Sequence, residues 1–234
     1  MRVGNWSIIL AALALASCGS EAPAPDPAPT REVPSDPLPV MGPERHILAF
    51  GDSLFAGYGV GEGESYPDRL QAALRARGVN AQIANAGVSG DTTAAGLARI
   101  EFVLDNAEHV PDLAIVELGG NDLLRGIAPA ETRQNLAAII MELQERDIPI
   151  LLMGMRAPPN LGDAYVSDFD AIYPSLAERY GVKLVPFFLA ATYDKPELIQ
   201  QDHIHPTAEG IEALVAATVD QVADALPQEG EGAK

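Results

Sequence analysis

The sequence has little of several features that mark common protein classes. It contains one cysteine, Cys18, which excludes an intrachain disulfide and a zinc site built from several thiolates. Lys and Arg number 15 against 33 Asp and Glu, for a formal net charge of −18. This balance argues against nucleic acid as a partner, because such binding needs clustered basic residues, and against electrostatic docking to anionic lipid. An acidic surface facing water is the simpler interpretation.

The N-terminus carries an apolar run, Ile8 to Ala16, that is too short to span a bilayer as a stable helix. Together with the charged start Met1-Arg2, this run predicts a signal peptide at residues 1–17. It ends at Leu15-Ala16-Ser17-Cys18, which resembles a bacterial lipobox and predicts lipid attachment at Cys18. An ordinary secretory signal with an incidental cysteine is the alternative.

The composition divides the rest of the chain into three parts. Residues 18–43 are rich in proline and form a predicted extended linker, which would act as a spacer of about 3.1 Å per residue. Residues 44–226 form the predicted folded domain, and the acidic tail 227–234 is predicted to be disordered. Gly19, rather than an acidic residue, follows the cysteine. In a Gram-negative host, the resemblance to sorted lipoproteins therefore favours the periplasmic face of the outer membrane.

Within the folded domain, short apolar runs alternate with amphipathic stretches. The apolar runs predict five buried strands, at His46–Phe50, Gln82–Asn85, Leu113–Leu118, Ile148–Met153 and Lys183–Phe187. The stretches between them predict helices, three of which have recognisable N-caps: Ser65, Ser167 and Thr207. Gly78 and Gly181 are predicted to end two of the helices. Such alternation predicts an α/β fold, a three-layer α/β/α sandwich around a five-stranded parallel sheet.

The most informative segment runs from Ile47 to Leu54, where an apolar strand ends at Gly51-Asp52 and Ser53 follows at once. A serine at this place lies at the carboxyl edge of the predicted sheet, where open α/β folds bind ligands. Ser53 is therefore a candidate nucleophile, although a serine here could also be a simple helix N-cap. Ser89 is a weaker candidate, since Asp91 stands where a nucleophile elbow needs glycine.

A serine nucleophile needs a base and an acid that orients the base. Asp202 and His205 lie three residues apart near the C-terminus, close enough for the carboxylate to hold one imidazole nitrogen while the other faces Ser53. His203 competes with His205, and a His-x-His pair also suggests a metal, but no third ligand cluster is evident. The spacing from Asp202 and the following Pro206 favour His205.

The remaining requirement is a set of donors for an oxyanion. Besides the Ser53 backbone N–H, two candidates follow predicted strands: Gly87, within Asn85–Asp91, and Asn121, within Leu118–Asp122. Glycine lets a backbone N–H approach a substrate closely, and an asparagine amide is a neutral donor suited to a developing negative charge.

These blocks, taken in order, resemble the SGNH (GDSL) hydrolase family. The resemblance rests on Gly51–Leu54, Ser89–Thr93, Gly96–Arg99, Val116–Asp122 and Ile204–Pro206, and extends from about Arg45 to Leu226. It is nearest to the bacterial arylesterase, thioesterase and lysophospholipase branch. It implies flavodoxin-like strand order and hydrolysis of an ester or thioester by Ser53, His205 and Asp202. Ser53, Gly87 and Asn121 would form the oxyanion hole, with no metal or organic cofactor.

Two loops are predicted to form the acyl pocket, Leu123–Pro129 and Arg156–Tyr165, because both follow strands on the same edge. Whether any single side chain in them lines a pocket or simply faces water stays open. Two alternatives also remain at this point. One is a non-catalytic, lipid-anchored binding protein on the same scaffold, and the other is a carbohydrate acetylesterase.

Overall fold

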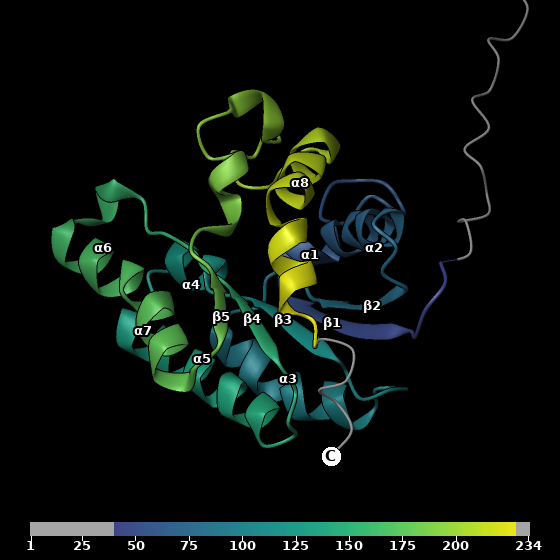
Figure 1. Ribbon diagram of the computed structural model, residues 1–234. Coiled ribbons are helices and arrows are strands. Elements are labelled where there is room, and N and C mark those ends of the chain that lie inside the picture. The colour runs from purple at the N-terminus through teal and green to yellow at the C-terminus, as the bar shows by residue number, and fades with distance from the viewer. Residues whose placement is uncertain (1–39, 228–234) are drawn as a thin grey trace, which may run out of the picture. The chain divides into compact units, whose positions relative to one another are not determined.

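The centre of the fold is one parallel sheet, which Figure 1 shows edge-on between two groups of helices. The structure is a computed structural model, and it describes residues 40–227. Its strands lie in the order β2-β1-β3-β4-β5. They are β1 (Arg45–Gly51), β2 (Ala81–Gly87), β3 (Leu113–Glu117), β4 (Ile150–Met153) and β5 (Lys183–Val185). All neighbouring strands pair in parallel. The predicted five-stranded parallel sheet with flavodoxin-like order is confirmed.

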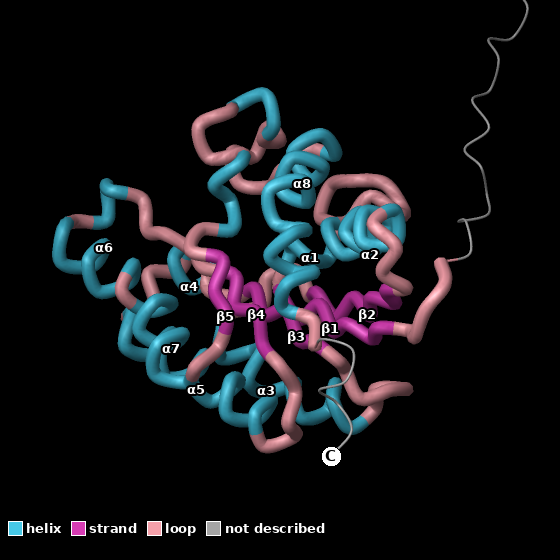
Figure 2. Tube along the Cα trace, viewed as in Figure 1, coloured by secondary structure: helices cyan, strands magenta, loops and turns pink. Residues whose placement is uncertain are grey.

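Helices cover both faces of the sheet and complete the three predicted layers (Figure 2). On one face α1, α2 and α8 pack together, and on the other α3, α5, α6 and α7 do so. The helices are α1 (Ser53–Ala56), α2 (Tyr66–Ala76), α3 (Thr93–Asp105), α4 (Gly120–Leu124), α5 (Pro129–Gln144), α6 (Asp163–Asp170), α7 (Ile172–Tyr180) and α8 (Ala208–Ala225). Short 3-10 turns lie at η1 (Pro159–Leu161), η2 (Phe188–Ala191) and η3 (Pro196–Leu198).

Proline explains where two strands are shorter than the apolar runs predict. β4 begins at Ile150 rather than Ile148, because Pro149 has no N–H to give to a ladder, although its carbonyl still accepts from Ala114 N at 2.9 Å. β5 ends at Val185, directly before Pro186. β2 is an edge strand and is more exposed than the buried strand that was predicted.

The predicted helix ends are confirmed except at one position. Ser65 forms a capping box with Asp68, and the Thr207 side chain accepts from Gly210 N at the start of α8. Gly181 ends α7 in the left-handed conformation. The prediction that Ser167 caps a helix is wrong, because α6 runs through this residue and the next helix begins only at Ile172. No N-cap side chain bond marks the start of either α6 or α7.

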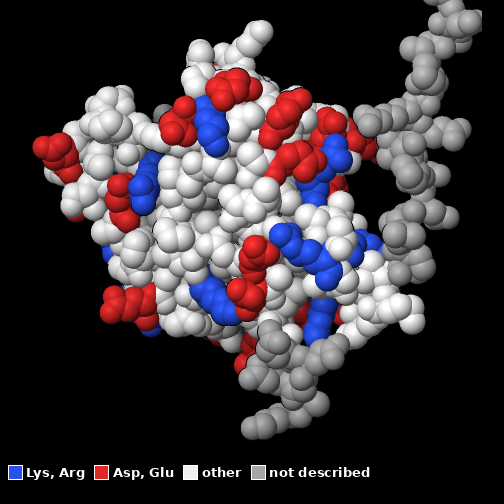
Figure 3. Space-filling model, turned by 45° about the horizontal axis from the view of Figure 1, so that its top comes forward, with Lys and Arg blue, Asp and Glu red and all other residues white. Residues whose placement is uncertain are grey.

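Charged groups of both signs are dispersed over the surface. On the face shown in Figure 3, acidic and basic side chains lie close to one another. Ion pairs between α2 and α8 are an example: Arg69 lies 3.3 Å from Glu212, and Arg77 lies 3.1 Å from Asp220. Within residues 40–227, no helix combines the length and the apolar content needed to cross a bilayer.

Candidate active site

Ser53 is the first residue of α1 and follows directly on the buried strand β1. The N-cap of this short helix is Asp52, whose Oδ1 accepts from Leu54 N at 3.0 Å. The interpretation of Ser53 as a mere N-cap is therefore wrong, and its hydroxyl group is available for another contact. That contact is His205, whose Nε2 lies 2.8 Å from Ser53 Oγ across 152 positions of the chain.

Asp202 lies on the other side of the same imidazole. His205 Nδ1 is 2.6 Å from Asp202 Oδ2, while the backbone N–H groups of Ile204 and His205 both donate to Asp202 Oδ1 at 3.0 Å. When Nδ1 donates to the carboxylate, Nε2 is left as the acceptor that faces Ser53 Oγ. The structure thus brings together the three residues that the sequence predicts, in a chain of two hydrogen bonds.

The carboxyl group of Asp202 is ionised well into the acid range. Partial burial opposes ionisation, but the hydrogen bonds from the His205 ring and from the backbone of His205 and Ile204 lower the pKa of Asp202 to about 2. The side chain is 35% exposed, so water screens this interaction. Asp202 is therefore suited to hold the imidazole and to stabilise its charged form.

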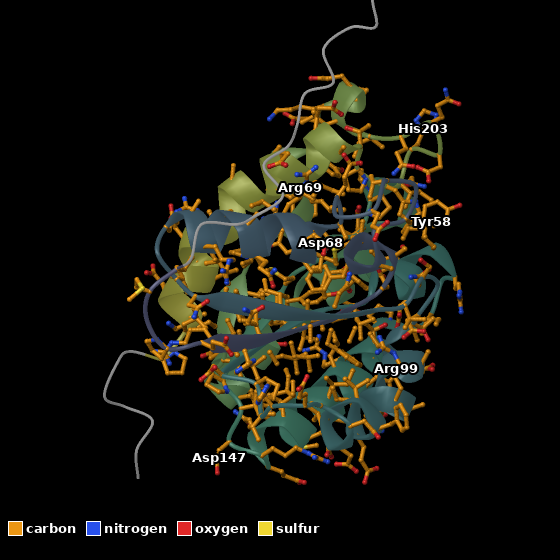
Figure 4. The ribbon with its side chains drawn as sticks, turned by 90° about the vertical axis from the view of Figure 1, so that its right-hand side faces the viewer. Tyr58, Asp68, Arg69, Arg99, Asp147 and His203 are labelled. Atoms are coloured by element: carbon orange, nitrogen blue, oxygen red, sulfur yellow. The ribbon has the colours of Figure 1, made fainter. Side chains whose placement is uncertain are left out.

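His203 lies near this group but does not join it. It is exposed, lines the cavity described below, and its backbone has the unusual φ of 61°. Figure 4 shows His203 and Tyr58 at the same edge of the molecule, far from Asp147 at the opposite edge. The hydrogen bonds of the imidazole to Ser53 and Asp202 belong to His205, as the spacing predicts.

Two residues that the sequence did not single out hold His205 in place. The ring of Tyr58 lies against the ring of His205 at a centroid distance of 4.3 Å. Gln200 Nε2 donates to Tyr58 O and to Pro206 O, each at 2.8 Å, and so ties the His205 loop to the segment after Ser53. Gly59 makes room for this amide, since a Cβ there would lie 2.2 Å from Gln200 Oε1. The only sequence signal is an aromatic residue between two glycines directly after α1.

The predicted oxyanion donors do not all reach the site. Asn121 does: it lines the cavity beside Ser53, and its Nδ2 donates to Asp52 Oδ2 at 3.0 Å, which leaves the second amide hydrogen for a ligand. Gly87 does not line the cavity, and its N–H donates to Asn85 Oδ1 at 2.9 Å. A Cβ at Gly87 would lie 2.4 Å from Ala56 N, so this glycine serves close packing against α1.

Gly90 stands where Gly87 was expected. It lines the cavity together with Ser53 and Asn121, and its φ of 87° turns the loop after β2 toward them. Its carbonyl group is held by Arg125 Nη2 at 2.7 Å. Among residues 40–227, the Gly90 N–H has no acceptor. The neighbouring Ser89 also lines the cavity, but Ser53 and not Ser89 bonds to His205.

The cavity beside Ser53 has a volume of about 680 Å³, which is ample for a small ligand. Its lining is largely apolar and includes Leu123, Leu124, Pro158 and Leu161, which come from the two segments that the sequence predicts. The first of these segments begins in helix α4 and not in a loop as predicted, and the second contains η1. The hydroxyl group of Tyr165 donates to Ile127 O at 2.8 Å and so joins these loops. In the part of the chain that the structure describes, no group of three or more His, Cys, Asp or Glu is arranged to hold a metal ion.

Two acidic side chains are buried beneath the site. Asp52 is 2% exposed and Glu117, at the end of β3, is fully buried. Burial raises the pKa of Asp52, although hydrogen bonds from Leu54 and Asn121 oppose the rise. Burial, and then the charge of Asp52, raise the pKa of Glu117 well above its ordinary value. Glu117 lies within the motif Val116–Asp122, and the sequence pattern assigns it no role.

The chain is similar to several known proteins. The sequence model of the GDSL-like Lipase/Acylhydrolase family matches residues 49–213. An arylesterase from Vibrio mimicus is 42% identical over 163 residues, covering 70% of this chain and 80% of the relative. Thioesterase 1/protease 1/lysophospholipase L1 from Escherichia coli is 41% identical over 160 residues, covering 68% and 74%.

Solved structures give the same result. AlinE4, an SGNH-hydrolase family esterase, is 69% identical and aligns over 80% of this chain and all of its own, with a TM-score of 0.68. The crystal structure of TesA is 35% identical, covers 78% of this chain and all of its own, and has a TM-score of 0.73.

Proposed function

Because the chain belongs to the GDSL-like lipase/acylhydrolase family and is an ester hydrolase, we propose that Ser53, His205 and Asp202 form its catalytic triad. The observation that carries the proposal is the continuous hydrogen-bonded chain from Ser53 Oγ through the His205 ring to Asp202. In this arrangement the serine has a base within reach and the base has an acid that orients it.

The reaction follows from the positions of these atoms. Ser53 Oγ attacks the carbonyl carbon of the substrate while His205 Nε2 takes the hydroxyl proton. His205 then gives this proton to the leaving group, and an acyl-enzyme on Ser53 remains. A water molecule attacks the acyl group, its proton passes to Nε2, and that proton returns to Ser53 as the acid product leaves. Asp202 keeps Nδ1 protonated throughout and stabilises the imidazolium.

Three donors are suited to stabilise the oxyanion of the tetrahedral intermediates: the backbone N–H of Ser53, the backbone N–H of Gly90 and the free amide hydrogen of Asn121. Gly90 replaces Gly87 in this proposal, because Gly90 faces the cavity while the N–H of Gly87 is bonded to Asn85. The apolar part of the cavity would take the acyl chain of an ester or a thioester.

A fluorophosphonate probe tests the triad directly, since it reacts with an activated serine. We expect labelling at Ser53 in the full chain, no labelling and almost no esterase activity in Ser53→Ala, and both retained in the matched control Ser89→Ala. Labelling at Ser89 in place of Ser53 would overturn the proposal. It would also identify Ser89, the weaker of the two candidate serines, as the nucleophile.

The substrate class needs a panel of p-nitrophenyl esters, acyl-CoAs, lysophospholipids and acetylated sugars. We expect acyl esters or thioesters to be better substrates than acetylated sugars, because the cavity wall is mostly apolar. Faster release of acetate from sugars would favour the carbohydrate acetylesterase. The alternative of a non-catalytic binding protein finds no support in the relatives, which are named as enzymes.

We further propose that the protein is an exported lipoprotein, anchored through Cys18 at the periplasmic face of the outer membrane. Its support is the sequence pattern alone, because Cys18 and the linker before residue 40 lie outside the described residues, as does most of the acidic tail. The mature chain should partition with membranes and show the mass of a lipid adduct, and Cys18→Ser should lose both. Full-length wild type found only in the soluble periplasm, with no mass shift, would refute the anchor.

A further inference from the structure

The buried acids Asp52 and Glu117 lie side by side because β1 and β3 are neighbours in the sheet. Gly51 pairs in register with Glu117, so the residue after Gly51 lies next to the Glu117 side chain. Asp52 N donates to Glu117 Oε2 at 3.4 Å. A Cβ at Gly51 would lie 3.0 Å from Glu117 Oε2, so glycine at this position leaves room for the carboxyl group.

The two acids have very different hydrogen-bond partners. Both oxygens of Asp52 accept bonds, Oδ1 from Leu54 N and Oδ2 from Asn121 Nδ2, each at 3.0 Å. Glu117 Oε1 is buried and has no partner within residues 40–227. Neither acid has a basic side chain within ion-pair distance in this part of the chain. Two adjacent buried carboxyl groups without a cation do not both ionise.

A third buried acid at the same edge shows how many donors a carboxyl group can receive in this fold. Asp122 is fully buried and accepts from Thr93 N at 2.9 Å, from Thr93 Oγ at 2.5 Å and from Thr132 Oγ at 3.0 Å. Within residues 40–227, three donors thus stabilise Asp122 and two stabilise Asp52, whereas Glu117 accepts only the long contact from Asp52 N. The proton of the Asp52–Glu117 pair therefore belongs on Glu117.

We propose that Glu117 is a positioning residue of the active site: its neutral carboxyl group orients the Asp52 carboxylate, which holds the Asn121 amide and the start of α1. A protonated carboxyl group can donate to Asp52, whereas an ionised one would repel it. Asp52 Oδ2 accepts one amide hydrogen of Asn121, so the other faces the cavity. This inference rests on the role proposed above for Asn121 and Ser53.

The charged and titratable groups around Glu117 agree with a neutral acid. Asp52 from the β1–α1 turn acts on Glu117 electrostatically, and Glu117 and Asp122 of α4 both act on Tyr173 from α7. His205 acts on Asp52. The phenol of Tyr173 donates to Leu118 O at 2.8 Å and so does not serve the Glu117 carboxylate. Burial and Asp52 both raise the pKa of Glu117.

The kinetic test compares Glu117→Leu with Glu117→Gln in the full chain. Removing the donor should loosen Asp52 and Asn121, so Glu117→Leu should lower kcat by about 10- to 100-fold, part of the loss known for a missing oxyanion donor. Its KM should change far less. Glu117→Gln should recover most of kcat, because the Gln amide can donate to Asp52. A folded Glu117→Leu variant with wild-type kcat would overturn the proposal, while continued fluorophosphonate labelling of Ser53 would leave the triad standing.

The protonation state is tested by thermal melts, which remain decisive if the Leu variant does not fold. A buried Glu with a raised pKa stabilises the folded state less as the pH rises above the ordinary Glu value. The Tm of Glu117→Gln minus that of wild type, measured from pH 5 upward, should therefore grow by about 3–5 °C per pH unit until the pH reaches the raised pKa of Glu117. The control Asp122→Asn should be less stable than wild type across this range. A Glu117→Gln difference that stays constant with pH would refute a neutral Glu117.

Discussion

The active site is assembled from two regions that differ in how firmly they are built. One, the frame, lies at the ends of β1 and β3 and consists of Ser53 and Asn121 together with the buried residues Asp52 and Glu117 beneath them. The other is the irregular loop between η3 and α8, where Asp202 is exposed and Ile204 is 41% exposed. The frame comes from the sheet core, whereas the loop is held by a few hydrogen bonds.

The contrast predicts which substitutions should change both stability and rate, and which should change mainly the rate. Changes in the frame disturb buried hydrogen bonds and should affect folding together with rate. Changes in the loop leave the core intact and should affect the rate far more than the stability. Both regions meet at the contact between Ser53 Oγ and His205 Nε2, which gives the largest expected effect.

Replacing His205 by alanine should remove about 10⁴-fold or more of kcat, because Ser53 would lose its base. His203→Ala, the matched control in the same loop, should keep most of the activity. The Tm of both variants should stay close to that of wild type. Steady-state kinetics on a p-nitrophenyl ester gives the ranking, and the reverse order would move the triad onto His203.

Asn121→Ala tests the frame. We expect kcat to fall by about 10²- to 10³-fold with a much smaller rise in KM, because the donor acts on the transition state. The Tm should fall as well, since Asp52 Oδ2 would lose its donor. Kinetics and thermal melts on one preparation measure both effects. A change confined to KM would mean that Asn121 only binds the substrate.

Asp202→Asn should have an intermediate effect, about 10- to 100-fold in kcat, which is less than the roughly 10⁴-fold loss for a buried triad aspartate. The reason is its 35% exposed side chain, which lets water replace part of the carboxylate. Because its pKa is lowered to about 2, the carboxylate stabilises the fold above its ordinary pKa. The Tm advantage of wild type should vanish as the pH falls from about 4 toward 2. A loss of kcat in Asp202→Asn equal to that in His205→Ala would contradict this intermediate contribution of Asp202.

Gln200→Ala should show the smallest effect. It removes the two hydrogen bonds that tie the loop to Tyr58 and Pro206. If their net free energy appears in the rate, kcat should fall about 2- to 10-fold. Kinetics at several temperatures would show a larger loss on warming as the loop departs from Ser53. A wild-type rate at all temperatures would mean that the loop holds its geometry without this tie.

Much of the fold could be read from local patterns. Short apolar runs placed all five strands, and Ser65, Thr207 and Gly181 marked helix ends correctly, because capping depends on neighbouring residues. Ser167 failed as a cap because a serine inside an amphipathic helix has the same local appearance as one at its start. The meeting of Ser53, Asp202 and His205 also followed from motifs at the ends of predicted elements.

What the sequence by itself determined was therefore the sheet, its carboxyl edge and the residue types gathered there. Only the tertiary structure decided which glycine reaches the cavity: Gly87 is the last residue of β2, whereas Gly90 lies in the loop that follows and lines the cavity beside Ser53. The contact of Gln200 with Tyr58 spans 142 positions, and no local pattern encodes it. Likewise, the role of Glu117 in an apolar strand cannot be predicted before strand pairing places it beside Asp52. The reason is that the cost of burying a charge depends on its neighbours in space.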